Sequence, residues 1–468
     1  MIKIYQIKKL SIEKKAAIVF VLATAISSGL NMLTTPLFTR LMPVASFGTV
    51  QLYNTWYQVL WVFSTFSVTN AVVNVGFHDY PKDRMGFLSS SLGLSSLCTL
   101  FFAFVVLLFR HLFESYSGLN ISLIILMIMS FLFLNSTQLW ICLSRYELKY
   151  KTVFWVIALS AIFSSLISLL AVYKTTDNYA EVRLWTQHSI QLIVGLFLFV
   201  FIIVKGKKFF NKQYWLFILT FNAPLLIHYL SQFILSSSDR LMIKFYSNES
   251  DVAIYSLAYL ASNIMMVFFS PINSVIIPRT HQLMDDRNYS EVENFLYKLL
   301  FFIGGIVFVI SLFSPEIISI LGGNQYKDGI KIVPIISAST LFTILYLYVA
   351  NIEFLYGKTT RIAFMTIIAA ILNIVLNSIF LPLFGFSAAA YTTLISYIVY
   401  AWLHVVNMNK LVGVQVFSNI KLSIICAIIV GLCMSTILLP DFYFLRYTIF
   451  IIIILIAIFY RKKILKAF

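Results

Sequence analysis

The feature that most constrains this chain is its succession of long apolar segments. A segment of roughly twenty apolar residues crosses the hydrocarbon core of a membrane as one α-helix, whereas a membrane β-barrel shows short segments of alternating polarity. The sequence therefore predicts an all-α, polytopic membrane protein with about fourteen transmembrane helices. We expect these helices over residues 16–39, 46–75, 85–109, 119–143, 152–172, 184–204, 214–235, 252–276, 295–314, 332–356, 362–383, 387–407, 422–440 and 442–460.

Charged residues are too scarce to give a soluble protein of this length its polar surface. Only 11% of the 468 residues are charged, while 60% are hydrophobic. The sequence also lacks a metal-type Cys/His cluster, a phosphate-binding loop and the nucleophile motifs of hydrolases. We therefore expect a protein that is not an enzyme and that needs no metal and no cofactor.

Basic residues are distributed unevenly between alternate connections. The net charge is +16, and 25 of the 34 Lys and Arg residues fall in one set of alternate connections, which includes both termini. Because cytoplasmic loops carry the excess of Lys and Arg, both termini are predicted to lie in the cytoplasm, with the protein in the inner (cytoplasmic) membrane. The basic excess then reflects topology, so we expect no nucleic-acid partner.

A short repeat predicts two halves of the same orientation. Arg40-Leu41-Met42 ends the first predicted helix, and Arg240-Leu241-Met242 follows the seventh. The spacing of six helices is even, which is the plan of parallel repeats. We expect two six-helix lobes in a parallel pseudo-repeat plus two C-terminal helices, in a monomer. The expected boundaries are 1–213 for the N-terminal lobe, 214–410 for the C-terminal lobe and 411–468 for the helix pair.

Polar side chains gather in the first, second, seventh and eighth predicted helices. Polar groups in hydrocarbon need partners or a water-filled cavity, so the cluster predicts a hydrophilic cavity, although any single residue can instead join two helices by a hydrogen bond. Asn31, Asn222 and Asn263 are candidate cavity residues. The candidate sugar contacts are Tyr53, Trp56, Tyr57, Gln58, Tyr255 and Tyr259.

Three basic residues are candidates for binding an anionic group in that cavity. Arg40 and Arg240 supply planar, multidentate donors that suit a diphosphate, and Lys244 lies nearby. The alternative is that the arginines are interfacial residues paired with lipid phosphates, or that Arg240 pairs with Asp239.

Two further residues are candidates for energy coupling. Glu353, near the inner end of the tenth predicted helix, can bind a coupling cation or proton. The alternative is that it reaches the interface or pairs with Lys358 or Arg361. His228, in the middle of the seventh predicted helix, can carry protons or simply be a hydrogen-bonded packing residue.

Several motifs resemble those of one transporter family. The segment from Asn373 to Asn377, followed by Leu381-Pro382-Leu383-Phe384-Gly385, resembles a signature of Wzx-type oligosaccharide flippases, and Asp239-Arg240 with the segment 253–256 resembles their link between helices 7 and 8. These flippases belong to the multidrug/oligosaccharidyl-lipid/polysaccharide exporter superfamily. We expect Pro382 and Gly385 to form the outer turn between helices 11 and 12.

The resemblance implies a cationic central cavity between two lobes, alternating access, and an undecaprenyl-diphosphate-linked oligosaccharide repeat unit as cargo. It also implies contacts with membrane lipids, and with a polysaccharide polymerase and chain-length machinery as partners. One alternative is a MATE-type cation-coupled exporter of small molecules, which usually has twelve helices and a first-lobe carboxylate. Another is a membrane O-antigen polymerase or ligase, which needs a larger outer loop than this sequence contains.

Overall fold

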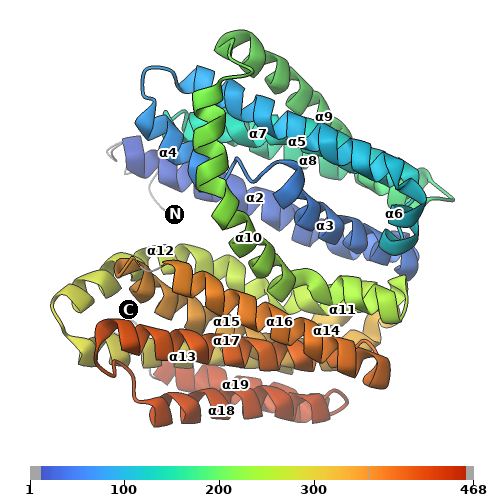
Figure 1. The fold of residues 1–468 in the computed structure, drawn as a ribbon. Helices are drawn as coiled ribbons and strands as arrows, with labels where there is room; N and C mark the ends of the chain where they lie inside the picture. Colours follow the sequence, from blue (N-terminus) through green and yellow to red (C-terminus); the bar gives the residue numbers. More distant parts are fainter. Residues whose placement is uncertain (1–11, 358, 460–468) are drawn as a thin grey trace. The chain divides into compact units, whose positions relative to one another are not determined.

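The regular structure of this chain is helical. The computed structural model describes residues 12–357 and 359–459, and every regular element within them is a helix. In chain order the helices are α2 (Ile12–Leu41), α3 (Val44–Ser64), α4 (Ala71–Asp79), α5 (Arg84–Leu108), α6 (Arg110–Ser117), α7 (Ile121–Tyr146), α8 (Tyr150–Lys174), α9 (Tyr179–Gly206), α10 (Lys212–Tyr246), α11 (Glu249–Ser262), α12 (Ile264–Asp285), α13 (Tyr289–Leu312), α14 (Ser314–Leu321), η1 (Asn324–Lys331), α15 (Ile332–Leu355), α16 (Thr359–Phe384), α17 (Ala388–Val412), α18 (Asn419–Ser435), η2 (Thr436–Leu438) and α19 (Tyr443–Phe459) (Figure 1).

The number of membrane crossings depends on how interrupted helices are counted. Within the described residues, eleven helices are long and apolar enough to cross a membrane. The second and eighth predicted helices are each divided in two, as α3 with α4 and α11 with α12, and the last, α19, has a shorter apolar part. The predicted all-α, polytopic fold is confirmed, and the fourteen predicted segments all correspond to helical structure.

The first interruption lies between α3 and α4, so the prediction of one continuous helix over 46–75 was wrong. Phe66 and Ser67 adopt left-handed conformations, with φ of 53° and 49°, which an α-helix cannot accommodate. Asn222 on α10 donates its Nδ2 to the carbonyl oxygen of Phe66 at 2.8 Å. A side chain distant in sequence thus pairs with a carbonyl group in the interruption, as an irregular backbone at membrane depth requires.

The second interruption lies at Asn263, between α11 and α12. The amide Nδ2 of Asn263 donates to the carbonyl oxygen of Tyr259 at 3.1 Å, so this side chain satisfies backbone at the end of α11. The same helix of each predicted half is therefore interrupted, which is a feature of transporters built from repeats.

Helix α10 is longer than predicted. It was expected to end at residue 235 but continues to Tyr246, so Arg240 lies within the helix rather than after it. Residues 236–246 contain no Gly or Pro to stop a helix, and the buried side chain of Asp239 finds hydrogen-bond partners on neighbouring helices.

The chain separates into two compact units, residues 1–233 and 234–468, with the boundary inside α10. In unit 1, α2 packs on α8, and α7 and α8 both pack on α9. In unit 2, α15 is a largely buried helix that contacts α11, α13, α17 and α18 (Figure 1). The predicted lobe boundaries at 213 and 410 stay a prediction.

The last helices pack within unit 2. Helix α18 lies against α13 and α15. On α19, the buried Arg446 donates to the carbonyl oxygen of Leu312 at 3.0 Å and to the Glu316 carboxylate at 2.6 Å. The C-terminal helix is therefore attached by a charge-assisted hydrogen bond to the connection after α13.

Contacts between connections follow the predicted alternation. In unit 1, Asp83, before α5, accepts hydrogen bonds from Lys208 at 2.5 Å and Tyr214 at 2.7 Å, both near the connection between α9 and α10. In unit 2, residues of η1, of the α16–α17 turn and of the segment after α18 line one pocket of about 600 Å³. Each group joins connections of one predicted side, while the identity of that side stays a prediction.

Candidate functional site

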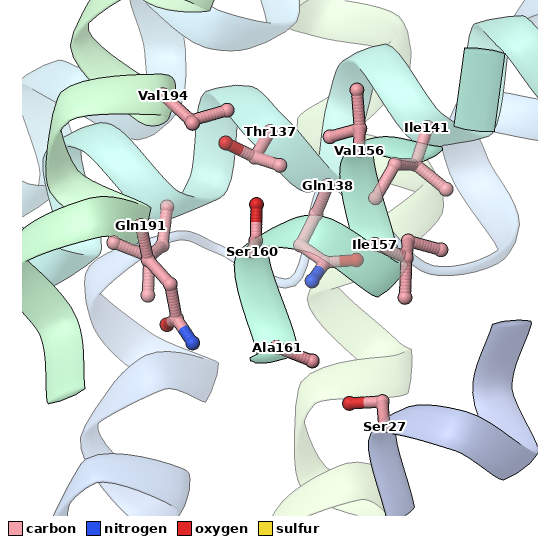
Figure 2. A pocket seen from close by; sticks show the side chains of 11 residues that line it. Ser27, Thr137, Gln138, Ile141, Val156, Ile157, Ser160, Ala161, Gln191 and Val194 are labelled. Carbon is pink, nitrogen blue, oxygen red and sulfur yellow. The ribbon is translucent and has the colours of Figure 1, made fainter. Parts of the chain in front are cut away.

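A polar pocket lies inside unit 1. Its volume is about 160 Å³, and its polar lining comes from four helices: Ser27 on α2, Thr137 and Gln138 on α7, Ser160 on α8 and Gln191 on α9. Figure 2 shows these side chains around the space, together with apolar residues such as Ile141 and Val194. The lining carries hydroxyl and amide groups and no charged side chain.

The chemistry of this lining suits a neutral ligand rich in hydroxyl groups. Hydroxyl and carboxamide side chains offer both donors and acceptors, and the apolar residues between them can contact the faces of a sugar ring. Most of the polar residues of this pocket lie outside the first, second, seventh and eighth predicted helices, so the pocket was not predicted from the sequence. The signal that was available is the pair of glutamines, Gln138 and Gln191, inside otherwise apolar helices.

A second polar site surrounds the buried Asp239 in unit 2. Its carboxylate accepts hydrogen bonds from the hydroxyl groups of Tyr255 and Thr393, each at 2.7 Å, and from Nδ2 of Asn377 at 2.8 Å. Four helices, α10, α11, α16 and α17, thus converge on one carboxylate. Neutral donors of this kind stabilise a charge that burial would otherwise make costly.

The asparagines of the helix 11–12 signature belong to this site. Asn373 accepts hydrogen bonds at 3.2 Å from Ser238 and from Asn377, and Thr392 also donates to Asn377. Both asparagines are fully buried. Their positions show that the signature builds a hydrogen-bond network around Asp239, a residue that the sequence suggested only as a partner of Arg240.

Arg240 lies beside this network and makes other contacts. Its guanidinium lies over the ring of Tyr259, 4.5 Å from the centroid, while Nε donates to Ser256 Oγ at 3.2 Å. Lys244, one turn later, forms an ion pair with Glu249. The charge of Lys244 is therefore neutralised locally, whereas the half-buried guanidinium of Arg240 is held in a fixed orientation by neutral groups.

The first-half candidates are more exposed. Arg40 is exposed on the last turn of α2 and donates to the carbonyl oxygen of Pro36 at 3.1 Å. Asn31 and Gln58 are exposed as well. Trp56 donates its Nε1 to the carbonyl oxygen of Ser117 at 3.3 Å.

Two tyrosine pairs occupy similar places in the two units. The ring centroids of Tyr53 and Tyr57 on α3 are 6.2 Å apart. The ring centroids of Tyr255 and Tyr259 on α11 are separated by the same distance, 6.2 Å. In unit 1 the edge of His188 meets Tyr53 at 5.7 Å. Four of the six candidate sugar contacts therefore lie as two adjacent aromatic pairs, and the role of all six stays a prediction.

The two coupling candidates differ in their surroundings. His228 is half-buried on α10 beside Tyr229. Glu353 is fully buried, so the expectation that it reaches the interface was wrong. Its carboxylate contacts His404 and Asn407 on α17, while Arg361 is exposed and Lys358 lies outside the described residues. No pattern in the sequence had indicated a role for His404.

The turn between α16 and α17 differs in detail from the prediction. Gly385 follows α16 with φ of 73°, the left-handed conformation that glycine adopts at the end of a helix. Pro382, however, lies inside the last turn of α16 rather than in the turn itself. Its exposed ring is compatible with the helix end because α16 ends two residues later, at Phe384.

In the part of the chain that the structure describes, no three or more His, Cys, Asp or Glu side chains lie close enough to hold a metal ion together. The oxygen-rich network around Asp239 offers carboxylate and amide oxygens, the ligand types that hard cations prefer. The expectation that the chain needs no metal and no cofactor stays a prediction.

The model of the family described as "Polysaccharide biosynthesis protein" matches residues 14–284, more than half of the chain. The chain belongs to this family. A second family model, MatE, matches residues 224–379. The predicted membership of the multidrug/oligosaccharidyl-lipid/polysaccharide exporter superfamily is confirmed, and the chain is a multi-pass membrane transporter of the flippase type.

Relatives in the sequence comparison are distant. An uncharacterized membrane protein of Methanocaldococcus jannaschii is 23% identical over 81% of this chain and 79% of its own length. A probable low-salt glycan biosynthesis flippase, Agl15, of Haloferax volcanii is 23% identical over 38% of each chain.

Among solved structures, the lipid II flippase MurJ in an inward closed conformation has a TM-score of 0.71 at 18% identity, covering 96% of this chain and all of that one. An inward-facing MATE family transporter has a TM-score of 0.60 at 13% identity, covering 85% of this chain and 98% of its own. At these identities the likeness concerns the fold.

Proposed function

We propose that this protein translocates an undecaprenyl-diphosphate-linked oligosaccharide repeat unit across the bacterial cytoplasmic membrane by alternating access. Membership of the polysaccharide biosynthesis family and similarity to a probable glycan biosynthesis flippase support a lipid-linked glycan as cargo. The similarity to the lipid II flippase over almost the whole chain supports a fold that handles such cargo. Both termini lie in the cytoplasm in this proposal.

The observation that carries the proposal is the chemistry of the pocket in unit 1. Hydroxyl and amide groups line it without any charged residue, which suits a sugar better than a cationic drug. Arg240, whose guanidinium lies over the ring of Tyr259 and donates to Ser256, suits the diphosphate. Arg40 is the corresponding candidate in the first half.

The proposal has a direct test in the organism that carries the gene. Deleting the gene should abolish the surface polysaccharide, and lipid-linked repeat units should accumulate on the cytoplasmic side of the membrane, where an external glycosidase cannot reach them. A polymerase or ligase defect would instead leave unpolymerised or unattached units on the outer side. Normal polysaccharide together with increased sensitivity to cationic drugs would contradict the proposal and favour a MATE-type exporter, the function that the MatE match over residues 224–379 suggests.

The pocket itself can be tested with a matched pair of variants. Gln191→Leu removes an amide from the pocket lining, whereas Gln187→Leu makes the same change one turn earlier on α9, outside the lining. We expect Gln191→Leu to reduce polysaccharide export by about tenfold, the effect of losing one to two hydrogen bonds to the cargo, and Gln187→Leu to leave it unchanged. Equal export by both variants would remove the pocket from the translocation path.

A further inference from the structure

A carboxylate and an imidazole form a buried pair in unit 2, away from the Asp239 network. Glu353, two residues before the end of α15, and His404 on α17 have fully buried side chains. Glu353 Oε2 lies 2.5 Å from His404 Nδ1. Asn407, nearly one turn after His404, donates its Nδ2 to Glu353 Oε1 at 2.5 Å. Side chains of one neighbouring helix therefore occupy both carboxylate oxygens.

Neutral rings surround the pair. The edge of Tyr400 meets His404 with 4.6 Å between centroids, and the ring of Tyr346 lies at 5.5 Å. Thr366 on α16 shares a hydrogen bond of 3.0 Å with the hydroxyl group of Tyr400. From α12, His281 contacts the carbonyl oxygen of Asn351 at 3.1 Å, two residues before Glu353.

Charged groups on the other helices around α15 and α17 are exposed, paired or, like Asp239 beside Thr393 of α17, hydrogen-bonded to neutral side chains. Glu293 on α13 accepts hydrogen bonds from Tyr297 and from the backbone of Ser418. On α11, Glu249 pairs with Lys244, and Arg279 on α12 lies 4.0 Å from Glu291. The exposed charged residues of η1, α16, α17 and α18 are Lys327, Asp328, Lys331, Arg361, Lys410 and Lys421.

The pair has three places for a proton, Oε2, Nδ1 and Nε2, and it is electrically neutral when two protons are bound. With one proton bound it carries one negative charge, and with three it carries one positive charge. Either charged state is costly in a buried environment of low dielectric constant. Nε2 of His404 is buried and lacks a hydrogen-bond partner among the residues that the structure describes, so the imidazole has one open position.

The geometry points to Glu353, His404 and Asn407 as the proton-binding site that couples transport to the proton gradient; the inference rests on the proposed function. With one proton bound, Nδ1–H of the neutral His404 donates to the ionised Glu353, and Nε2 is bare. When a proton binds at Nε2, the Nδ1 proton passes to Glu353 Oε2, so the carboxylate becomes the acid, the imidazole stays neutral and the buried negative charge is removed. Release of the proton from Nε2 returns the other proton from Oε2 to Nδ1 and restores the charge.

Proteoliposomes that contain the purified full-length protein and a fluorescent lipid-linked oligosaccharide test the inference. If one proton moves with one cargo molecule, a gradient of one pH unit should give about tenfold accumulation of cargo in one leaflet. Glu353→Gln keeps an amide in place of the carboxylate but cannot ionise, so we expect it to equilibrate the cargo with an accumulation ratio of about one. His281→Gln, which replaces a second histidine in the same unit, should keep the tenfold accumulation.

The outcomes separate the two hypotheses. If the wild-type protein moves no cargo, the proposed function fails. If it moves cargo without accumulation, or if Glu353→Gln accumulates cargo as the wild type does, only the proton site is refuted. His404→Asn, which keeps a donor near the position of Nδ1, should also abolish accumulation, and it decides the question if Glu353→Gln does not fold.

The protonation of Glu353 can also be followed by infrared spectroscopy. This measurement requires neither transport activity nor a functional Glu353 variant. Infrared titration of the wild-type protein in detergent should show a carboxylic-acid band that appears with decreasing pH. The band should be altered in His404→Asn. It should be kept in Asp239→Asn, which removes the buried carboxylate of the Asp239 network in unit 2. An identical band in the wild type and in His404→Asn would overturn the assignment.

Discussion

Asn222 on α10 donates a hydrogen bond of 2.8 Å to the carbonyl oxygen of Phe66, in the interruption between α3 and α4. The two residues are 156 positions apart, and the amide of Asn222 is fully buried. This contact gives an irregular stretch of membrane-embedded backbone a partner that water cannot supply there. Asn222, which the sequence predicted as a cavity residue, therefore has a structural role within unit 1.

Replacing Asn222 should destabilise the protein through this one carbonyl group. Asn222→Leu leaves the Phe66 oxygen buried without its donor, at a cost of about 1 to 3 kcal/mol. We expect a lower midpoint of thermal unfolding in detergent. Thr220→Val on the same helix, where the hydroxyl bonds only to its own helix backbone, should change the midpoint little. Equal stability of the two variants would show that the interruption does not need Asn222.

The Asp83 site should make stability depend on pH in a defined direction. Partial burial would raise the pKa of Asp83, but hydrogen bonds from Lys208 and Tyr214 outweigh it, and the pKa is lowered. A carboxylate with a lowered folded-state pKa stabilises the protein above its unfolded-state pKa, and this stabilisation is lost as the pH falls through the folded-state pKa. Because both charged partners are partly exposed, we expect at most about 1 kcal/mol.

The measurement compares thermal unfolding of the wild type and Asp83→Asn at several pH values. The wild type should be the more stable protein near neutral pH, and the difference should shrink as the pH falls below the ordinary carboxyl pKa of 3.8 and disappear below the lowered folded-state pKa. Lys208→Met should reproduce the loss at neutral pH, while Lys205→Met, at an exposed lysine of the same segment, should not. A difference that stays constant with pH would mean that the ionised form of Asp83 is not what stabilises the contact.

The two arginines should be essential for export if they bind the diphosphate. We expect Arg40→Ala and Arg240→Ala to abolish surface polysaccharide while the protein stays inserted in the membrane. Arg240→Lys should rescue partly, because lysine keeps the charge but loses the planar contact with Tyr259 and the fixed hydrogen bond to Ser256. Membrane fractions probed by immunoblotting control for insertion.

Lys244 provides the comparison for these arginines. Its charge is already paired with Glu249, so Lys244→Met should affect export much less than Arg240→Ala. Full complementation by both arginine-to-alanine variants would identify the arginines as interfacial residues and shift the search to Lys244 and Arg145.

The predicted orientation can be tested by cysteine labelling of intact cells. In a background without the four native cysteines, a membrane-impermeant thiol reagent should fail to label Lys207→Cys, in the connection after α9, and should label Lys327→Cys, in η1. Both positions are exposed, so access depends on the side of the membrane. Labelling of Lys207→Cys alone would reverse the predicted topology.

Much of the fold could be predicted from the sequence because hydropathy is a local property. Apolar segments of membrane length predicted where the helices run, and the helix 11–12 signature predicted the importance of Asn373 and Asn377. The interruption at Phe66 could not be predicted in this way, because an apolar sequence through a left-handed turn has the same hydropathy as an unbroken helix. The same limit explains why α10 was predicted to end too early.

The burial of Glu353 shows where local reasoning fails. A carboxylate near the end of a helix lies close enough to the interface to reach water, and nothing in the neighbouring residues indicates which way it turns. His404 and Asn407, 51 and 54 positions later, decide this by occupying both carboxylate oxygens. The pocket in unit 1 could not be predicted for the same reason, because its polar residues come from four helices that are separate in the sequence.

The sequence by itself determined that the chain is a polytopic helical membrane protein, where its apolar helices lie, and which exporter superfamily its motifs resemble. These properties depend on the free energy of transferring each segment into hydrocarbon, which adjacent residues supply. Only the tertiary structure decided which polar side chains meet: Asn222 with Phe66, Asp239 with Asn377, and Glu353 with His404. The rotation of each helix about its axis is set by packing against its neighbours, and no local pattern in the sequence encodes those neighbours.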